Sequence, residues 1–513
     1  MKKLLYFITI STLAVSSVAC SVSTENGASE NAINRPNSID IVAATELEEL
    51  EPLVEQASKE LGVNYNMVFE GGTLSNSRKL LNGDFDNDYE ATWFATNKYA
   101  ELIGASDKQG KTTKVATSPV ILGVKKGVAQ DLGWDSKSPQ WSEIVTAVDQ
   151  DKLDFGMTDP SESNSGFSSL IAVSTALAGR GESLNREDID RVTPELKTFF
   201  NGLSVTSGSS GWLKNRFMQY PNSADAIFNY ESVVYNMIDE GADIVPIIPE
   251  DGVINADYPL SQMSNNSEED NEKIENLVQW LLDHQADITQ HYLRPVDNTP
   301  VNERLGDKII IDLPYPGSQV VTEYLVDKYN DELRRPGNTV IVVDTSGSMR
   351  GNRIESLEQS LRTLNEESFR NRETVSIVSF SGNVNGTVTD TIDKEIGLST
   401  KIDGYIDTLN AGGETAIYST LIDTYEDFDT TNDAVNSIVL MTDGENTRGV
   451  NFKGFKDYYD SLDEAKKSIP VFIILYGESS EEEMEELAAL TGGKTFNGYD
   501  DLHSAFNQIR SYQ

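Results

Sequence analysis

The stretch Thr339-Val340-Ile341-Val342-Val343-Asp344-Thr345-Ser346-Gly347-Ser348 decides the fold of the C-terminal third of the chain. Its first half is β-branched and almost wholly apolar, as in a parallel strand that is buried on both faces of a sheet. A helical pattern follows from about residue 352 to residue 369. Ligands of open α/β sheets bind at the carboxyl ends of strands, so the polar residues that end this strand are well placed for binding.

Two further apolar runs repeat this arrangement downstream. Residues 437–441 end in Thr442-Asp443-Gly444, and residues 471–475 precede an acidic helical pattern that starts at about Ser480. Another helix is expected from Ala416 to about Phe428. This alternation of strands with helices predicts an α/β fold with a doubly wound, Rossmann-like parallel sheet.

Carboxylates and hydroxyls follow these strands, where the folded sheet would gather them. The predicted metal ligands are Asp344, Ser346, Ser348, Thr415 and Asp443. All offer oxygen, and no cysteine or histidine lies near them in the sequence, which favours a hard divalent cation over zinc. We expect Mg²⁺, with Ca²⁺ and Mn²⁺ as alternatives. Because few ligands are charged, the metal would keep an open position for a carboxylate from a protein partner.

These residues resemble the metal-ion-dependent adhesion site of von Willebrand factor A (VWA) domains, whose pattern is Asp-x-Ser-x-Ser, then a threonine, then an aspartate. The resemblance covers residues 337–513 and includes the ending Leu490-Thr491-Gly492-Gly493-Lys494. It implies that Ser346, Ser348 and Thr415 bind the metal directly, and that both aspartates bind it directly or through water. Glu414 departs from the pattern, because many relatives have glycine directly before the threonine. A degenerate site without metal is the alternative.

The region from residue 38 to residue 330 repeats a strand, small polar residues and a helix. Such junctions occur at residues 39–45, at Gly71-Gly72-Thr73-Leu74-Ser75, around Thr117-Ser118 and at residues 158–166. Helix N-termini present free backbone N–H groups, and hydroxyls beside them add donors, which suits an anion or a polar small molecule. Each serine or threonine taken alone is more often a helix cap than a ligand contact.

Taken together, this region resembles a two-lobed, periplasmic-binding-protein-like solute-binding domain of the group that includes molybdate-binding proteins. The residues that carry the resemblance are those at 85–96, 122–124, 159–160, 230–232, 246–252 and 294–295. The resemblance implies that the chain returns to its first lobe after about residue 245. The expected solute-binding residues are Thr45, Thr73, Ser118, Ser163 and Tyr230. The ligand is expected to be a small oxyanion or another polar solute.

The N-terminus reads as a secretory signal. Met1-Lys2-Lys3 precedes an apolar run at residues 4–15, and small residues lead to Cys20. The segment resembles a bacterial lipoprotein signal, although Ser17 stands where that family usually has leucine. We therefore expect a signal peptide at residues 1–20, lipidation of Cys20 and a flexible tether at residues 21–37, with plain secretion or an uncleaved anchor as alternatives. The rest of the chain would lie outside the cytoplasm, held at the cell membrane or the outer membrane.

Composition limits the partners. The 513 residues carry a formal net charge of −42, which argues against nucleic acid and anionic lipid as main partners. Cys20 is the single cysteine, so a disulfide within the monomer is excluded. No Gly-x-Ser-x-Gly elbow and no zinc cluster is present in the sequence, so enzymatic activity is not expected.

Three functions remain as hypotheses from the sequence. The first is a surface binding protein that combines a solute-binding domain with a metal-dependent protein-binding domain. The alternative is the substrate-binding component of an ABC-type transport system. A hydrolase is the weaker alternative.

Overall fold

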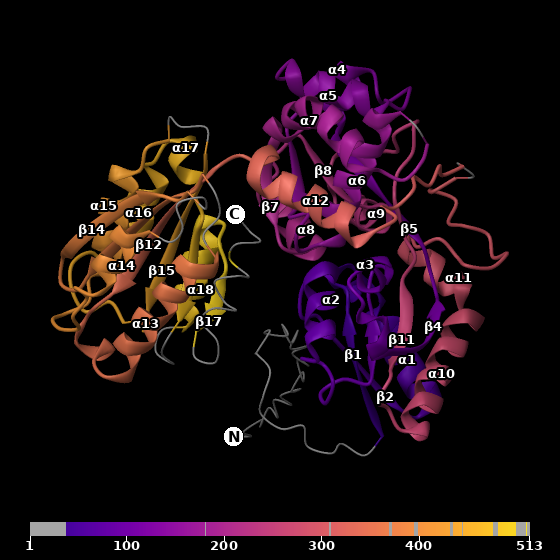
Figure 1. Cartoon of the computed structure of the whole chain (residues 1–513), viewed down its shortest axis with the longest axis horizontal. Coiled ribbons are helices and arrows are strands. Elements are labelled where there is room, and N and C mark those ends of the chain that lie inside the picture. Colours follow the sequence, from indigo (N-terminus) through magenta and orange to yellow (C-terminus); the bar gives the residue numbers. More distant parts are fainter. Residues whose placement is uncertain are drawn as a thin grey trace, which may run out of the picture. The chain divides into compact units, whose positions relative to one another are not determined.

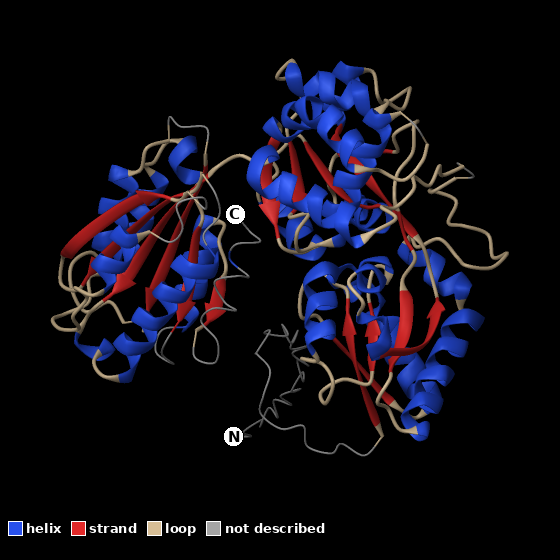
Figure 2. Cartoon of the chain, in the orientation of Figure 1, coloured by secondary structure: helices blue, strands red, loops and turns tan. Residues whose placement is uncertain are grey.

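Three β-sheets, each flanked by helices, form the framework of the protein (Figure 1, Figure 2). The computed structural model describes residues 37–179, 181–306, 309–368, 372–393, 399–430, 434–443, 445–475, 481–498 and 509. Cys20, the expected signal peptide and all but the last residue of the expected tether lie outside the described residues. Within the described ranges, no helix combines the length and the apolar character needed to cross a membrane.

The first sheet, which with its helices we call lobe one, forms around the apolar strand predicted after residue 38. Its strand order is β2 (Asn64–Val68), β1 (Ser38–Ala43), β3 (Ala91–Trp93), β11 (Pro259–Met263) and β4 (Gln109–Lys114). Strand β1 is parallel to β2 and β3, whereas β11 is antiparallel to β3 and β4. Its helices are η1 (Thr45–Leu50), α1 (Glu51–Leu61), α2 (Thr73–Asn82), α3 (Lys98–Leu102), η2 (Ala105–Lys108), α10 (Glu268–Asp283), α11 (Gln285–Ile288) and η3 (Thr289–His291).

The second sheet, with its helices, is lobe two. Its strand order is β10 (Asn255–Ala256), β5 (Ser118–Lys125), β8 (Ala226–Tyr230), β6 (Phe155–Thr158) and β7 (Leu203–Ser207), and β9 (Ile244–Ile247) also pairs with β5. Strand β6 is parallel to both β7 and β8. Its helices are α4 (Lys126–Leu132), α5 (Trp141–Asp149), α6 (Asn164–Ala178), α7 (Arg186–Asn201), α8 (Ser210–Gln219) and α9 (Glu231–Asp239). Helices α12 (Gln319–Lys328) and η4 (Tyr329–Leu333) pack their apolar side chains into the same core.

The lobes are joined by paired extended segments. Ser118, at the start of β5, pairs antiparallel with Ala256 of β10, and Thr117 bridges to Arg294. The return to lobe one therefore follows β9, as the resemblance to solute-binding proteins implied. Apolar side chains of both lobes share one core cluster, in which Leu47 and Leu50 of lobe one lie with Leu213 of lobe two. The two lobes are in direct contact.

The third sheet forms around the stretch that begins at Thr339. Its strand order is β14 (Val384–Thr391), β13 (Thr374–Phe380), β12 (Gly337–Asp344), β15 (Val435–Thr442), β16 (Val471–Leu475) and β17 (Thr495–Asn497). All its pairs are parallel except β13 with β14. The predicted α/β class with a doubly wound sheet is confirmed, and the antiparallel hairpin at its edge is an addition that the sequence analysis did not predict.

Helices cover both faces of the third sheet. They are η5 (Gly347–Met349), α13 (Asn352–Thr363), η6 (Leu364–Ser368), α14 (Thr400–Ile406), α15 (Ile417–Asp427), α16 (Phe452–Asp460), α17 (Glu464–Lys467) and α18 (Glu481–Thr491). Side chains alternate between the faces of a strand. Accordingly, Ile341 and Val343 of β12 pack in the cluster that includes α13 and α14, whereas Val342 packs in the cluster that includes α15, α16 and α18.

A close approach of backbone segments in lobe two yields a first prediction. A Cβ atom added at Gly166 of α6 would lie 2.0 Å from the carbonyl oxygen of Thr158, at the end of β6. Because backbone must move to admit it, Gly166→Ala should lower the free energy of unfolding by at least about 1–3 kcal/mol. Urea unfolding followed by tryptophan fluorescence measures this loss.

The matched control is Gly127→Ala in α4, where no atom lies within 4 Å of the added Cβ. Alanine is favoured over glycine in a helix, so this variant should be as stable as the parent or up to about 1 kcal/mol more stable. Equal unfolding midpoints for the two variants would contradict the tight packing of α6 against β6.

Candidate functional site

The predicted metal ligands start with Asp344, the last residue of β12, which is fully buried. One carboxylate oxygen accepts a hydrogen bond from the backbone N–H of Ser346 (2.8 Å), and the other accepts from the hydroxyl of Thr442 (2.8 Å). Both carboxylate oxygens are therefore fixed by neighbouring groups, and the following loop is held against the carboxylate. Thr442 is a supporting residue that the sequence analysis did not single out.

The other predicted ligands reach the same edge of the sheet. The Thr415 loop is attached to the Asp344 loop by two backbone hydrogen bonds, Gly412 N–H to Thr345 O (2.8 Å) and Gly347 N–H to Gly413 O (3.0 Å). Strand β15 lies next to β12 in parallel, with Met441 opposite Val343, so Asp443 follows β15 at the same edge. The hydroxyl oxygens of Ser346 and Ser348 are 3.0 Å apart.

Electrostatics at this edge are unfavourable for two carboxylates without a cation. Burial raises the pKa of Asp344 to about 6, and the nearby charge of Asp443 adds to the effect. Arg353 of α13 partly offsets the charge, because its guanidinium donates to a carboxylate oxygen of Asp443 (3.0 Å) and to the carbonyl of Ser348 (3.2 Å). The Arg353 side chain is 43% exposed, so the pair is screened by solvent.

The donor set fits a hard divalent cation. It consists of two carboxylates and three hydroxyls, all of them oxygen donors. Among the described residues, no group of three or more His, Cys, Asp or Glu side chains is arranged to hold a metal ion. Adjacent ligands of an octahedral Mg²⁺ lie roughly 3 Å apart, because each is about 2.1 Å from the ion. The spacing of the Ser346 and Ser348 hydroxyls is compatible with this geometry.

Glu414, the departure from the VWA pattern, forms an ion pair with Arg448 (2.7 Å), and both side chains are more than half exposed. Thr415 is nevertheless buried, and its backbone is held by Thr447, whose hydroxyl accepts from the Thr415 N–H (2.9 Å). The extra carboxylate therefore has its own cationic partner at the surface.

A cavity of about 390 Å³ lies beside the loop that begins at Thr345 and carries Ser346 and Ser348. Its lining residues are Thr345, Ser379, Ser381, Asn385, Gly386, Tyr405, Thr408, Leu409, Asn410, Ala411 and Gly412. None of them is charged. Thr345 separates two predicted metal ligands, so a molecule that reaches the metal would also have this neutral, polar cavity within reach.

The second predicted site, for a solute, lies where the two lobes meet. The carboxyl ends of β1 and β3 in lobe one and of β6 and β8 in lobe two meet there. Gly211 N–H of lobe two donates to the hydroxyl of Thr45 in lobe one (3.4 Å). Ser75 N–H of lobe one donates to the carbonyl of Glu162 in lobe two (3.1 Å).

The five predicted solute residues have different surroundings in this junction. The hydroxyl of Thr73 accepts from Ala95 N–H (3.2 Å), and that of Ser118 accepts from Ser232 N–H (3.2 Å). Ser163 is buried and precedes α6 as its N-cap residue, without a side-chain capping bond. Tyr230 is buried, and its hydroxyl accepts from the amide of Asn164 (3.1 Å). The two threonines and Ser118 thus already serve as acceptors for backbone N–H groups.

Sequence reasoning missed three residues of these sites. Glu46 directly follows Thr45 and is buried in the junction, but in the sequence it is one of several acidic residues at the start of a helical pattern. Tyr258 is fully buried beside Tyr230, with ring centroids 5.9 Å apart. Arg353 could have been suspected, because a cation one turn into the helix after a metal-ligand loop lies near the ligands.

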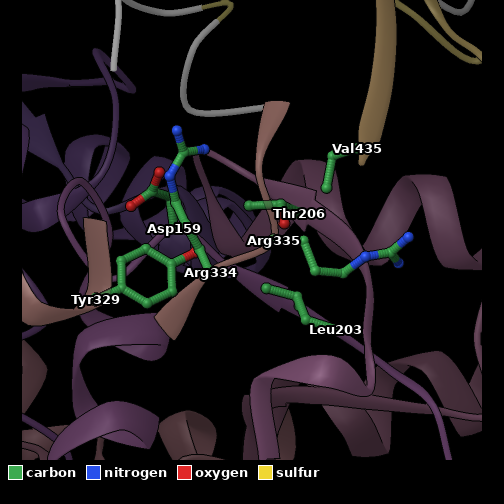
Figure 3. Close-up of a pocket in the computed structure, with 7 residues that line it drawn as sticks. All are labelled: Asp159, Leu203, Thr206, Tyr329, Arg334, Arg335 and Val435. Atoms are coloured by element: carbon green, nitrogen blue, oxygen red, sulfur yellow. The ribbon is translucent and has the colours of Figure 1, made fainter. Parts of the chain in front are cut away.

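Figure 3 shows a further pocket. It is lined by Asp159, Leu203, Thr206, Tyr329, Arg334, Arg335 and Val435. Its volume of about 10 Å³ is close to the least that holds one water molecule. This pocket is therefore too small for a solute.

Comparison with known proteins agrees with this division of the chain. The family model for bacterial extracellular solute-binding proteins matches residues 41–291, and that for the von Willebrand factor type A domain matches residues 338–510. Residues 41–291 are therefore similar to bacterial extracellular solute-binding proteins, and residues 338–510 are similar to VWA domains. No curated protein matches the chain.

Solved structures similar to this chain include three binding proteins. The periplasmic binding protein AfuA from Actinobacillus pleuropneumoniae, solved with fructose-6-phosphate, is 12% identical, and the match covers 58% of this chain and 98% of that one with a TM-score of 0.47. The sulfate-binding protein SubI from Mycobacterium tuberculosis is 17% identical (56% and 98% covered, TM-score 0.44). A periplasmic thiamin binding protein is 10% identical (57% and 95% covered, TM-score 0.45).

The contact between Arg353 and Asp443 yields a second prediction. Because the guanidinium competes with a bound cation for the Asp443 carboxylate, Arg353→Gln should raise the affinity for Mg²⁺. The gain should be up to about fivefold, since a partly exposed ion pair contributes at most about 1 kcal/mol. Isothermal titration calorimetry measures the change.

Arg350→Gln is the matched control, because Arg350 precedes the same helix and donates to the carbonyl of Ala411 rather than to a carboxylate. It removes the same charge from the same region. An equal gain in both variants would show that the effect is long-range and that Arg353 does not compete for Asp443.

Proposed function

We propose that the chain is an extracytoplasmic binding protein whose VWA domain holds a divalent cation and, through it, an acidic side chain of a protein partner. The observation that carries this proposal is the convergence of Asp344, Asp443 and three hydroxyl residues at one edge of the third sheet. Mg²⁺ is the expected ion. Asp344 is held beside the Ser346 loop by two hydrogen bonds, and burial disfavours its charge in the absence of a cation.

The residues of this chain have separate roles in that function. Ser346, Ser348 and Thr415 would supply neutral oxygens, and the two aspartates would supply the charge. With few charged ligands, the ion retains positive charge and attracts a carboxylate. The neutral cavity that begins at Thr345 would then receive the partner residues next to this carboxylate, because it has no charged side chain to repel them.

Loss of a carboxylate tests the metal site. Asp443→Ala in the whole chain should weaken Mg²⁺ binding at least about tenfold, because a charged group of a metal site contributes at least that much to affinity. The fold should persist, since Asp443 follows a strand and, although buried, is not part of the apolar core. Calorimetry with Mg²⁺, Ca²⁺ and Mn²⁺ measures binding.

Asp460→Ala is the control, because Asp460 is an exposed aspartate at the end of α16. It should bind Mg²⁺ like the parent. The parent chain failing to bind any of the three ions at millimolar concentration would contradict the proposal, and so would an Asp443→Ala variant that binds as tightly as the parent.

The junction between the lobes supports a second function, the binding of a small solute. Buried polar side chains from both lobes meet there, and Thr45 of lobe one is bonded to Gly211 of lobe two. Closure of two lobes over a solute would use such contacts. Delivery of that solute to an ABC-type permease is compatible with this function.

We further propose that Cys20 carries a lipid that holds the protein at a membrane. The carrying observation is the sequence of residues 1–20, with its basic start, apolar run and single cysteine. Cys20→Ser should abolish incorporation of radiolabelled palmitate and release the protein from the membrane fraction. Retention of label and of membrane association in this variant would refute the lipid anchor.

A further inference from the structure

Glu46 is a buried carboxylate at the junction of the lobes. It lies in η1, three residues after the end of β1, with 9% of its surface exposed. Its Oε1 atom has no hydrogen-bond partner. Among the residues that the structure describes, no lysine or arginine forms an ion pair with Glu46. An uncompensated carboxylate is costly in such surroundings, so this oxygen calls for a donor or a cation from outside the chain.

Two aromatic rings accompany this carboxylate. Tyr230 comes from the end of β8, and Tyr258 comes from the segment that returns to lobe one. Both are fully buried, with ring centroids 5.9 Å apart and planes inclined by 59°. The backbone of Tyr258 has a φ of 34°, which is strained for a bulky residue and marks a position that the surrounding structure enforces.

The N–H groups that would bind an oxyanion here are already paired with protein oxygens. Ser75 N–H of α2 donates to Glu162 O, and Gly211 N–H of α8 donates to Thr45 Oγ1. At the start of α6, Gly166 N–H donates to Thr158 Oγ1 (2.7 Å). Ser232 N–H of α9 likewise donates to Ser118 Oγ (3.2 Å). All four helices that begin at this junction, α2, α6, α8 and α9, thus have a donor of their first turn taken up within the protein.

Two buried side-chain oxygens at the junction that lack a hydrogen-bond partner are acceptors. Asn164 donates its amide to the hydroxyl of Tyr230, which leaves its buried Oδ1 without a partner. Together with Glu46 Oε1, this gives the junction two buried acceptor oxygens whose side chains both interact with Tyr230, one from each lobe. A ligand that satisfies both must donate hydrogen bonds or carry positive charge.

We propose that the solute bound between the lobes is a small organic cation, whose ammonium group lies against Glu46 Oε1 and whose carbon substituents contact the rings of Tyr230 and Tyr258. A carboxylate combined with aromatic faces is the chemistry that recognises alkylammonium groups. This inference rests on the proposed solute-binding function and names its substrate class. It favours a cation over the oxyanion that the sequence analysis placed first.

The charge state of Glu46 makes the inference testable by pH. Burial raises the pKa of Glu46 from its ordinary value to about 7. The titratable groups that face it are the hydroxyls of Tyr230 and Tyr258, whose pKa values burial holds well above the ordinary range, so both stay neutral. Glu46 is therefore about one-tenth ionised at pH 6 and nine-tenths ionised at pH 8, and cation affinity should be about tenfold higher at pH 8.

The experiment uses the whole chain with two panels of probes. The cations are methylammonium, putrescine and choline, and the oxyanions are sulfate, phosphate and molybdate. Thermal shift identifies binders, because a ligand of the folded state raises its stability, and calorimetry at pH 6 and pH 8 gives affinities. We expect saturable binding of at least one cation, tighter at pH 8.

Glu46→Gln should weaken that binding at least about tenfold and remove its pH dependence, since glutamine keeps the shape without the charge. Glu48→Gln is the matched control, because Glu48 lies on the same helix with an exposed side chain. This control should bind like the parent. If the Glu46→Gln variant does not fold, the pH dependence of cation binding by the parent chain still tests whether Glu46 binds the cation.

Each other outcome overturns a defined claim. Binding of an oxyanion with no response to any cation overturns the cation inference and leaves solute binding intact. If the chain responds to neither panel, both the cation inference and the proposed solute-binding function are overturned. Cation binding that is equal at pH 6 and pH 8, or unchanged in Glu46→Gln, shows that the cation lies elsewhere and also overturns the inference.

Discussion

Parallel pairing of strands in register decides where most candidate site residues of this protein lie. Met441 lies opposite Val343 in the third sheet, so the residues after them, Asp344 and Thr442, share an edge and a hydrogen bond. In lobe two, β6 is parallel to β8 and β7, which brings the starts of α6, α8 and α9 to one side. The interiors of strands that are buried on both faces are mainly apolar, and the polar site residues gather at these edges.

Two buried carboxylates at such edges, Asp344 and Glu46, belong to the two candidate binding sites. Asp344 ends β12 and Glu46 follows β1, and burial raises the pKa of each. Their surroundings differ, because Asp344 accepts hydrogen bonds at both oxygens whereas Glu46 has one oxygen without a partner. The first accepts hydrogen bonds from a backbone N–H and a hydroxyl, and the hydroxyls of Ser346 and Ser348 lie close to it in the chain. The second is set among aromatic rings, which suit an organic group.

The sequence allowed the third sheet to be predicted in detail, because its central strands are continuous apolar runs that end in polar loops. Strand β16 has the bounds that were predicted. Strand β14 was missed because residues 384–391 lie at the edge of the sheet and are mostly polar. The sequence therefore shows no alternation of apolar and polar residues that would mark a strand. Glu46 and Tyr258 could not be recognised, because Glu46 lies about two hundred residues from both Tyr230 and Tyr258 in the chain.

The position of β11 in lobe one also fixes the order in which the protein can assemble. Strand β4 joins its sheet only through β11, which lies between it and β3, and β11 follows every strand of lobe two in the chain. As the polypeptide emerges from the ribosome or a translocation pore, the N-terminal lobe is made first but must wait with an open sheet edge. The strands of lobe two follow one another in the chain, so its sheet can be completed before that of lobe one. Lobe one is thus synthesised first, but its sheet is completed after that of lobe two.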